Sequence, residues 1–191
     1  MKKMNHTKYA ILGILTTGCN TGYAIKQLID QSLNHFWKIS YGQIYPTLKK
    51  LVADGLATVQ VIPQEGKPDR KEYYLTTTGK LELQKWLQQP ISEIPVEKNE
   101  LLLKLFFSSH QSNASTIQHL EHYRDKLSES YNTYKEIEKM ITSYPSNEND
   151  AQFWIFTLDY GIRTTLAAIE WCDATIQEIQ NKEDLNGQTD I

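Results

Sequence analysis

Residues 40–51 read SYGQIYPTLKKL, and this stretch decides the fold. Ile44, Leu48 and Leu51 recur at spacings of four and three residues, which predicts a helix with one apolar face. Pro46 conflicts with a helix interior, so either the regular helix begins near Pro46 or its early part is kinked. Most of the other positions carry polar or small side chains. We therefore expect a helix that buries one side and presents polar groups on the other.

Two further helical patterns precede this stretch. Thr7 opens the first, and Thr21 can cap the second after a turn at residues 16–20. Ser40 is a suitable N-cap for the third helix. The apolar positions of the first two patterns repeat at helical spacing, and they are Tyr9, Ile11, Leu12, Ile14, Leu15, Tyr23, Ala24, Ile25, Leu28, Ile29 and Leu33. Three such helices in a row predict a helix-turn-helix.

The periodicity changes after Gly55, which is expected to end the third helix as its C′ residue. Residues 56–62 (LATVQVI) alternate and are β-branched, and residues 71–75 (KEYYL) resemble a returning strand. Residues 63–68 (PQEGKP) form the turn between them. A fourth helix follows, capped by Thr77 or Thr78, with Leu81, Leu83, Trp86 and Leu87 on its apolar face and Pro90 at its end. Residues 1–90 are therefore predicted to form a winged helix-turn-helix domain.

The second half of the chain, residues 91–191, is predicted to be all-helical after a linker at 91–97. A short apolar helix at 101–107 precedes a long helix that starts at Asn113 or Ser115, and a turn at 144–147 leads into a last long helix. The polar tail, residues 186–191, is expected to fray. Two long helices cannot bury their wide apolar faces in so small a bundle, so an antiparallel pair that dimerises with a second copy is expected. The fold class is mainly α with a small β-hairpin wing.

Charge is distributed unevenly along the chain. Residues 1–90 carry 12 Lys and Arg against 6 Asp and Glu, whereas residues 91–191 carry 8 against 17. A basic first half can neutralise phosphates and release counterions, and an acidic second half would be repelled by DNA. Chance variation in surface charge is the alternative. No apolar run approaches the roughly 20 residues of a membrane span, and no signal peptide is recognisable. With only Cys19 and Cys172, far apart, we expect a cytoplasmic protein.

The third helix carries the predicted DNA-reading residues. A recognition helix fits the major groove, where each base pair presents a distinct pattern of donors and acceptors. Gln43 is the best candidate base reader because an amide can pair with adenine through two hydrogen bonds. Ordinary solvent exposure at a helix start is the alternative. The predicted contacts of this helix are Ser40, Tyr41, Gln43, Tyr45, Thr47 and Lys49 or Lys50.

Basic residues on the wing are the second set of candidates. Lys67, Arg70 and Lys71 can grip phosphates or enter the minor groove, although a charged hairpin tip is often simply solvated. Thr21 and Tyr23 mark the start of the second helix, whose backbone N–H groups suit a phosphate.

The sequence contains no motif for catalysis and none for a cofactor: HExxH, GxSxG, Walker A and GxGxxG are all absent. His119 and His122 lie one helical turn apart and could hold a metal with a third ligand such as Glu121, but plain surface histidines are the better interpretation. Cys19 is either a redox sensor or a small buried apolar residue, and we favour the second. We therefore expect neither an enzyme nor a metal site.

Large aromatic residues recur in the second half, and two interpretations of them remain open. They form a dimer core, or they line a pocket for a small planar effector that changes the spacing of the DNA-reading domains. The residues singled out are Tyr123, Trp154, Tyr160 and Trp171.

Taken together, these motifs resemble the PadR family of bacterial transcriptional regulators. The resemblance covers nearly all of residues 9–107, and the stretch at 40–51 is its most specific part. The other matching segments are 11–15 (ILGIL), 22–26 (GYAIK), Phe36-Trp37, Gly55-Leu56, 66–71 (GKPDRK), 73–76 (YYLT), Gly79 and Trp86-Leu87. Pro46, which conflicts with helix propensity, fits the family pattern.

The two long C-terminal helices resemble those of the larger PadR subgroup, with a virulence-regulator-type C-terminal domain. The resemblance implies a homodimeric repressor of a palindromic operator, in some members released by a small aromatic effector. Half-sites would lie roughly 34–36 Å apart. The C-terminal half matches only loosely, through its helices, Tyr160-Gly161 and Trp171, so no ligand identity is carried over. The alternative is a ligand-sensing or protein-interaction adaptor whose winged helix does not read DNA.

Overall fold

A computed structural model describes residues 5–94, 96–143 and 148–187 of the chain. The chain divides into two compact units, Met1–Ile94 and Pro95–Ile191. Among the described residues, the first unit contains four α-helices, a short 3-10 helix and a two-stranded hairpin, and the second contains three α-helices and another 3-10 helix. This architecture confirms the predicted mainly helical fold with a small β-hairpin.

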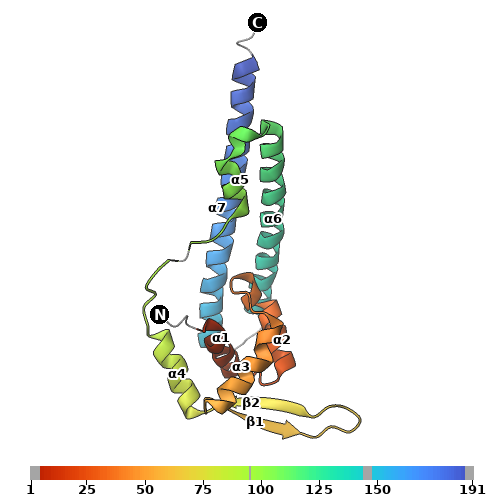
Figure 1. The fold of residues 1–191 in the computed structure, drawn as a ribbon, viewed down its shortest axis with the longest axis vertical. Helices are drawn as coiled ribbons and strands as arrows, with labels where there is room; N and C mark the ends of the chain where they lie inside the picture. Colours follow the sequence, from red (N-terminus) through yellow and green to blue (C-terminus); the bar gives the residue numbers. More distant parts are fainter. Residues whose placement is uncertain (1–4, 95, 144–147, 188–191) are drawn as a thin grey trace. The chain divides into compact units, whose positions relative to one another are not determined.

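The first unit begins with a three-helix arrangement. Its elements are α1 (His6–Thr16), α2 (Gly22–Gln31), the 3-10 helix η1 (Leu33–His35) and α3 (Tyr41–Ala53) (Figure 1). Their apolar faces meet in one core, in which the fully buried side chains are Ile11, Leu12, Ile25, Ile29, Leu48 and Leu51. These are positions that the helical periodicity predicted to be apolar and inward-facing.

Pro46 lies inside α3, because the helix already begins at Tyr41. The regular helix therefore starts before the proline and not near it. A proline removes the N–H that would bond the carbonyl four residues earlier, here that of Gly42. Gly42 and Pro46 are both exposed, so water can reach the freed carbonyl. The proline thus interrupts the helix only on its solvent side.

Gly55 ends α3 as predicted, with φ +70° in the left-handed region. The Gly55 N–H donates to the Val52 carbonyl at 3.1 Å, and the Leu56 N–H donates to the Leu51 carbonyl at 2.9 Å. This pair of bonds is the Schellman motif, which satisfies the last carbonyls of a helix. It turns the chain directly into the first strand.

The wing is an antiparallel hairpin of β1 (Ala57–Ile62) and β2 (Arg70–Leu75), in register from Ala57 opposite Leu75 to Ile62 opposite Arg70. The Tyr73 N–H donates to the Asn20 carbonyl at 2.8 Å, and Thr21 forms an isolated bridge with Glu72. The strand β2 is thereby attached to the residues immediately before α2.

Helix α4 (Thr77–Leu87) follows, and its N-cap is Thr76 and not Thr77 or Thr78 as predicted. Thr76 is the first residue after the strand and keeps extended dihedrals, which an N-cap requires. Its hydroxyl accepts from the Gly79 N–H at 3.0 Å and donates to the Gly55 carbonyl at 2.8 Å. Similarly, α1 is capped by Asn5, ahead of the predicted opening at Thr7.

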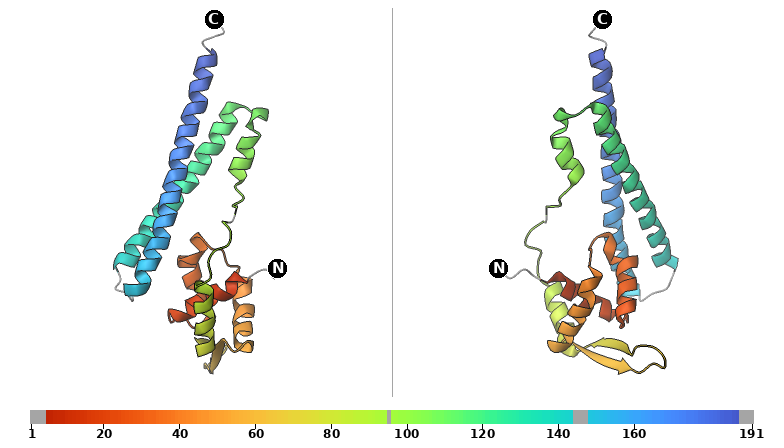
Figure 2. Two further views of the ribbon diagram at one scale, coloured as in Figure 1. Left: turned by 90° about the vertical axis from the view of Figure 1, so that its left-hand side faces the viewer. Right: turned by 45° about the vertical axis from the view of Figure 1, so that its right-hand side comes forward.

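The second unit consists of α5 (Glu100–Phe106), the 3-10 helix η2 (Ser108–His110), α6 (Asn113–Ser143) and α7 (Glu148–Gly187). Helices α6 and α7 run antiparallel and side by side (Figure 2). The core of this unit contains the buried residues Leu101 of α5, Leu120 of α6, and Cys172 and Ile176 of α7. The predicted turn at 144–147 and the end of the predicted tail, residues 188–191, lie outside the described residues.

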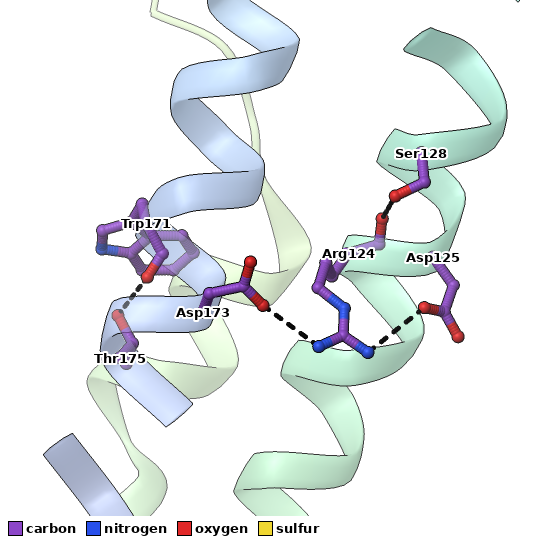
Figure 3. A network of polar contacts seen from close by, with 6 residues as sticks. All are labelled: Arg124, Asp125, Ser128, Trp171, Asp173 and Thr175. Carbon is purple, nitrogen blue, oxygen red and sulfur yellow. Dashed lines mark hydrogen bonds and ion pairs between the residues drawn. The ribbon is translucent and has the colours of Figure 1, made fainter. Parts of the chain in front are cut away.

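An ion pair crosses from α6 to α7 beside this core. Arg124 Nη1 donates to Asp173 Oδ1 at 3.0 Å, and Nη2 lies 3.5 Å from Asp125 (Figure 3). The hydrogen bond that Arg124 donates to Asp173 raises the pKa of Arg124. Within the described residues, no helix has both the length and the apolar character to cross a membrane.

Candidate nucleic-acid interface

Helix α3 is anchored through one face and exposed on the other. Ile44, Leu48 and Leu51 are buried in the core of the first unit. Successive helical residues are rotated by about 100°, so the positions between these three must point away from the core. Of the predicted reading residues, Ser40, Tyr41, Gln43, Tyr45, Lys49 and Lys50 are exposed and Thr47 is half-buried. The helix therefore offers a polar surface of the kind that enters a major groove.

Tyr45 packs against the start of α2. A Cβ added at Gly22 would lie 2.6 Å from the Tyr45 ring, so only glycine admits the ring in this position. The Tyr45 side chain nevertheless remains 56% exposed. Its ring and hydroxyl thus lie beside Gly22, the first residue of α2.

Thr21 caps α2 as predicted, and its hydroxyl accepts from the Ala24 N–H at 3.1 Å. Tyr23 is exposed and accepts a hydrogen bond from Gln27 at 3.1 Å. Gly22 did not figure among the predicted site residues. The signal that could have found it is a glycine at the first position of a helix, where its conformational freedom is not needed.

The Tyr41 side chain contacts two residues of α2. Its hydroxyl donates a short hydrogen bond to the Asp30 carboxylate, and the Lys26 ammonium lies 4.4 Å from its ring centroid. The bond to Asp30 raises the pKa of Tyr41. Sequence reasoning missed Asp30 and Lys26. Both belong to the exposed side of α2, and nothing in their spacing shows that the first residue of α3 reaches them.

An open, shallow depression lies at the beginning of α3 and the connection before it. The residues that line it are Asn34, Lys38, Ile39, Ser40, Tyr41 and Gln43. Gln43 therefore borders a shallow hollow at the N-terminal end of α3.

On the wing, Arg70 forms an ion pair within its own strand. Its Nη2 lies 2.5 Å from Glu72 Oε1, and the other oxygen of Glu72 accepts a short bond from the Tyr74 hydroxyl. This bond raises the pKa of Tyr74. The Arg70 side chain is 53% exposed but that of Glu72 only 12%. Arg70 is thus held on the strand face and partly neutralised, while Lys67 and Lys71 are exposed.

The aromatic candidates of the second unit do not gather in one place. Trp154, Tyr160 and Trp171 are exposed along α7, and Trp154 and Trp171 are separated by about 25 Å at the helical rise. Trp171 projects from the side of α7 away from α6 (Figure 3). Tyr123 is half-buried on α6, where its hydroxyl accepts from Asn99 at 3.0 Å.

The histidines and cysteines considered as metal ligands or redox sensors have defined places in the structure. His119 is half-buried and His122 exposed on α6, and the described part of the chain holds no group of three or more metal-ligating side chains. Cys19 packs, partly buried, against the core of the first unit. Cys172 is fully buried, and burial raises the pKa of its thiol.

Two protein families match this chain, one in each of its two units. The family described as "Transcriptional regulator PadR-like family" matches residues 11–85. The family "Virulence activator alpha C-term" matches residues 97–180. The negative transcriptional regulator PadR of Bacillus subtilis is 36% identical over 156 residues, which cover 78% of this chain and 84% of that protein.

Solved structures of the same relative are similar in fold to this chain. The crystal structure of Bacillus subtilis PadR in complex with operator DNA has a TM-score of 0.81 at 28% identity, covering 92% of this chain and 99% of the other. Its complex with p-coumaric acid has a TM-score of 0.77 at 27% identity, covering 91% and 98%. The likeness extends over both units of the chain.

Proposed function

Because the chain belongs to the PadR-like family of transcriptional regulators, we propose that it is a homodimeric repressor of a palindromic operator. The observation that carries this proposal is α3, which buries Ile44, Leu48 and Leu51 and leaves a polar surface outside. The named relative is a negative regulator whose structure has been solved with operator DNA. The family to which this chain belongs and the named relative are transcriptional regulators and not enzymes. Acting on chromosomal DNA, the protein would work in the cytoplasm.

In this proposal, α3 enters the major groove with Gln43 as base reader. The exposed amide can form two hydrogen bonds with adenine. Tyr45 and the beginning of α2 contact the phosphates of one strand, since the Tyr45 ring and hydroxyl lie beside Gly22, the first residue of α2. Lys67, Lys71 and Arg70 place the wing along the flanking backbone. Tyr23, Ser40, Thr47 and Lys49 complete the proposed contact set.

The proposed dimer uses the exposed face of α7. Rotating by about 100° per residue puts Phe153, Tyr160 and Trp171 on one line of α7, roughly opposite the buried Ile162 and Ile176. Phe153 is 65% exposed and Tyr160 72% exposed. So much aromatic surface on one helix face is typical of an interface core. A second copy would cover it and pair two DNA-reading units with two half-sites.

A small aromatic acid is the proposed effector class. The support is the relative's complex with p-coumaric acid. Because Trp154 and Trp171 lie far apart on one helix, they suit an extended dimer contact better than a common small-molecule pocket. We therefore propose a dimer role for Trp154, Tyr160 and Trp171.

The experiment that tests the proposal is selection of binding sites from a random duplex library, followed by anisotropy titration of the selected site at two salt concentrations. Gln43→Ala is expected to weaken binding about tenfold and relax the preference at one base pair, because one bidentate contact is lost. Arg70→Ala is expected to weaken binding to all sequences and to lower the salt slope.

Matched controls are Gln118→Ala and Lys126→Ala, both exposed on α6. They should leave DNA affinity unchanged. If the protein selects no sequence, the repressor proposal is wrong and the adaptor alternative takes its place. If the protein selects a site and the Gln43→Ala and Arg70→Ala variants both bind that site normally, the residue assignments are wrong while the proposed function stands.

A further inference from the structure

Asp30 is the centre of a polar cluster that joins α2 to the first residue of α3. Its Oδ1 accepts from the Tyr41 hydroxyl and from Asn34 Nδ2, the latter at 3.0 Å. Asn34 in turn accepts from the Ile39 N–H at 3.4 Å. The cluster therefore fixes the connection between the two helices and the direction of the Tyr41 side chain.

The direction of the Tyr41–Asp30 hydrogen bond limits what Tyr41 can bind. A phenolic hydroxyl has one proton, and an ionised carboxylate only accepts. With its proton directed at Asp30, Tyr41 has only lone pairs left for another partner. A tyrosine hydroxyl keeps its proton throughout the neutral range, and the bond to Asp30 raises the pKa of Tyr41 further. A hydroxyl in this state accepts hydrogen bonds and cannot donate a second one.

A phosphate oxygen is therefore an unsuitable partner for Tyr41. Phosphate oxygens accept hydrogen bonds, and the charge of Asp30 adds repulsion. Base edges are different, because the major groove exposes two donors, the N6 amino group of adenine and the N4 amino group of cytosine. Tyr41 is 48% exposed at the N-terminal end of α3, the part of a recognition helix that reaches base edges.

We propose that Asp30 is a specificity-determining residue that holds Tyr41 as a pure acceptor, so that Tyr41 reads an adenine or cytosine amino group at one base pair of each half-site. This inference rests on the proposed DNA-binding function. The Lys26 ammonium lies over the face of the Tyr41 ring, 4.4 Å from its centroid. Asp30 itself acts through Tyr41 and is a positioning residue.

Three variants separate the hydrogen bond from the charge. Tyr41→Phe removes the hydroxyl. Asp30→Ala removes both acceptor and charge, which frees the hydroxyl to donate to guanine, thymine or phosphate. Asp30→Asn removes the charge but keeps an acceptor, because the bond from Asn34 holds the amide oxygen toward Tyr41.

The test is a competitive titration of each purified variant against the library-selected site and all its single base-pair substitutions, with circular dichroism to verify folding. Tyr41→Phe is expected to lose about tenfold discrimination at one base pair per half-site, where the wild type prefers adenine or cytosine. Asp30→Ala is expected to shift that preference toward guanine or thymine and to bind unrelated DNA more tightly. Asp30→Asn is expected to keep the wild-type preference and bind unrelated DNA more tightly.

Three results would overturn the inference. One is a wild-type base profile retained at every position by folded Tyr41→Phe and Asp30→Ala proteins. Another is an Asp30→Asn protein that loses the preference as Asp30→Ala does, which would mean that charge and not the hydrogen bond is decisive. If the wild-type protein selects no site, the proposed function and this inference both fail; a selected site with unchanged profiles refutes this inference alone.

Discussion

The ring of Tyr45 occupies the space that a side chain at Gly22 would need, since a Cβ there would lie 2.6 Å from the ring. This contact joins the middle of α3 to the first residue of α2. It brings the Tyr45 hydroxyl to the helix end proposed to face a phosphate.

Gly22→Ala is therefore expected to weaken DNA binding more than it weakens the fold. The Tyr45 ring is exposed and can rotate away from the new methyl group, so the free energy of unfolding should change by less than about 1 kcal/mol. Displacing the hydroxyl should lower operator affinity. Urea unfolding and anisotropy titration measure the two quantities.

A double-mutant cycle provides the control. In a Tyr45→Ala background, Gly22→Ala should have almost no further effect on affinity. Additive losses in the double variant would show that Gly22 acts independently of Tyr45.

Gly79→Ala is expected to be strongly destabilising. A Cβ at Gly79 would lie 2.0 Å from the Leu56 carbonyl oxygen, a backbone atom that cannot rotate away. Relieving the clash requires moving α4, and we expect a loss of about 3 kcal/mol in urea unfolding. Gly13→Ala is the matched control, since no atom lies within 4 Å of its added Cβ and α1 should gain up to about 1 kcal/mol. Equal effects of the two substitutions would contradict the packing argument.

Glu72→Gln is expected to tighten binding to unrelated DNA. The substitution removes the charge that Arg70 now faces at 2.5 Å and leaves the guanidinium free for phosphates. The slope of log affinity against log salt should steepen by about one counterion. In an Arg70→Ala background the same substitution should change the slope less, and an undiminished effect there would mean that Glu72 acts through general repulsion.

Trp171→Glu is expected to shift the proposed dimer toward monomer. A buried charge without a partner is unfavourable in an apolar interface, and Trp171 lies on the same line of α7 as Tyr160. Sedimentation velocity over a concentration series measures the change. Gln177→Glu, an exposed substitution on α7 away from that line, should leave the association unchanged. A Trp171→Glu protein that associates like the wild type would exclude this face as the interface.

The sequence predicted the elements whose signals are local. Ile44, Leu48 and Leu51 identified the buried side of α3, and Gly55 identified its end, because helical periodicity and a left-handed cap depend on neighbouring residues alone. The cap at Thr76 was misplaced by one or two residues, since three consecutive threonines are equivalent until the strand end is known.

The contacts that organise the candidate site were not predictable in this way. Asp30 with Tyr41 and Gly22 with Tyr45 each depend on how separate helices pack, and Glu72 with Arg70 depends on the rotamers of two side chains on one face of β2. The sequence identified Tyr41, Arg70 and Tyr45 as exposed polar candidates, and the structure adds the partner that constrains each one. Their contacts with DNA stay predictions.

The hydrogen bond from β2 to Asn20 and its bridge to Thr21 divide the wing into two parts, and the amino-acid sequence is less constrained in one part than in the other. Residues near Tyr73 are bonded to the segment that precedes α2, so a change there disturbs the start of α2 as well. Residues 63–69 lie beyond the paired strands and carry no such constraint. Length and charge in that loop can therefore change at little expense to folding, and under the proposed function such changes would alter the preference for DNA flanking an operator while α3 stays the same.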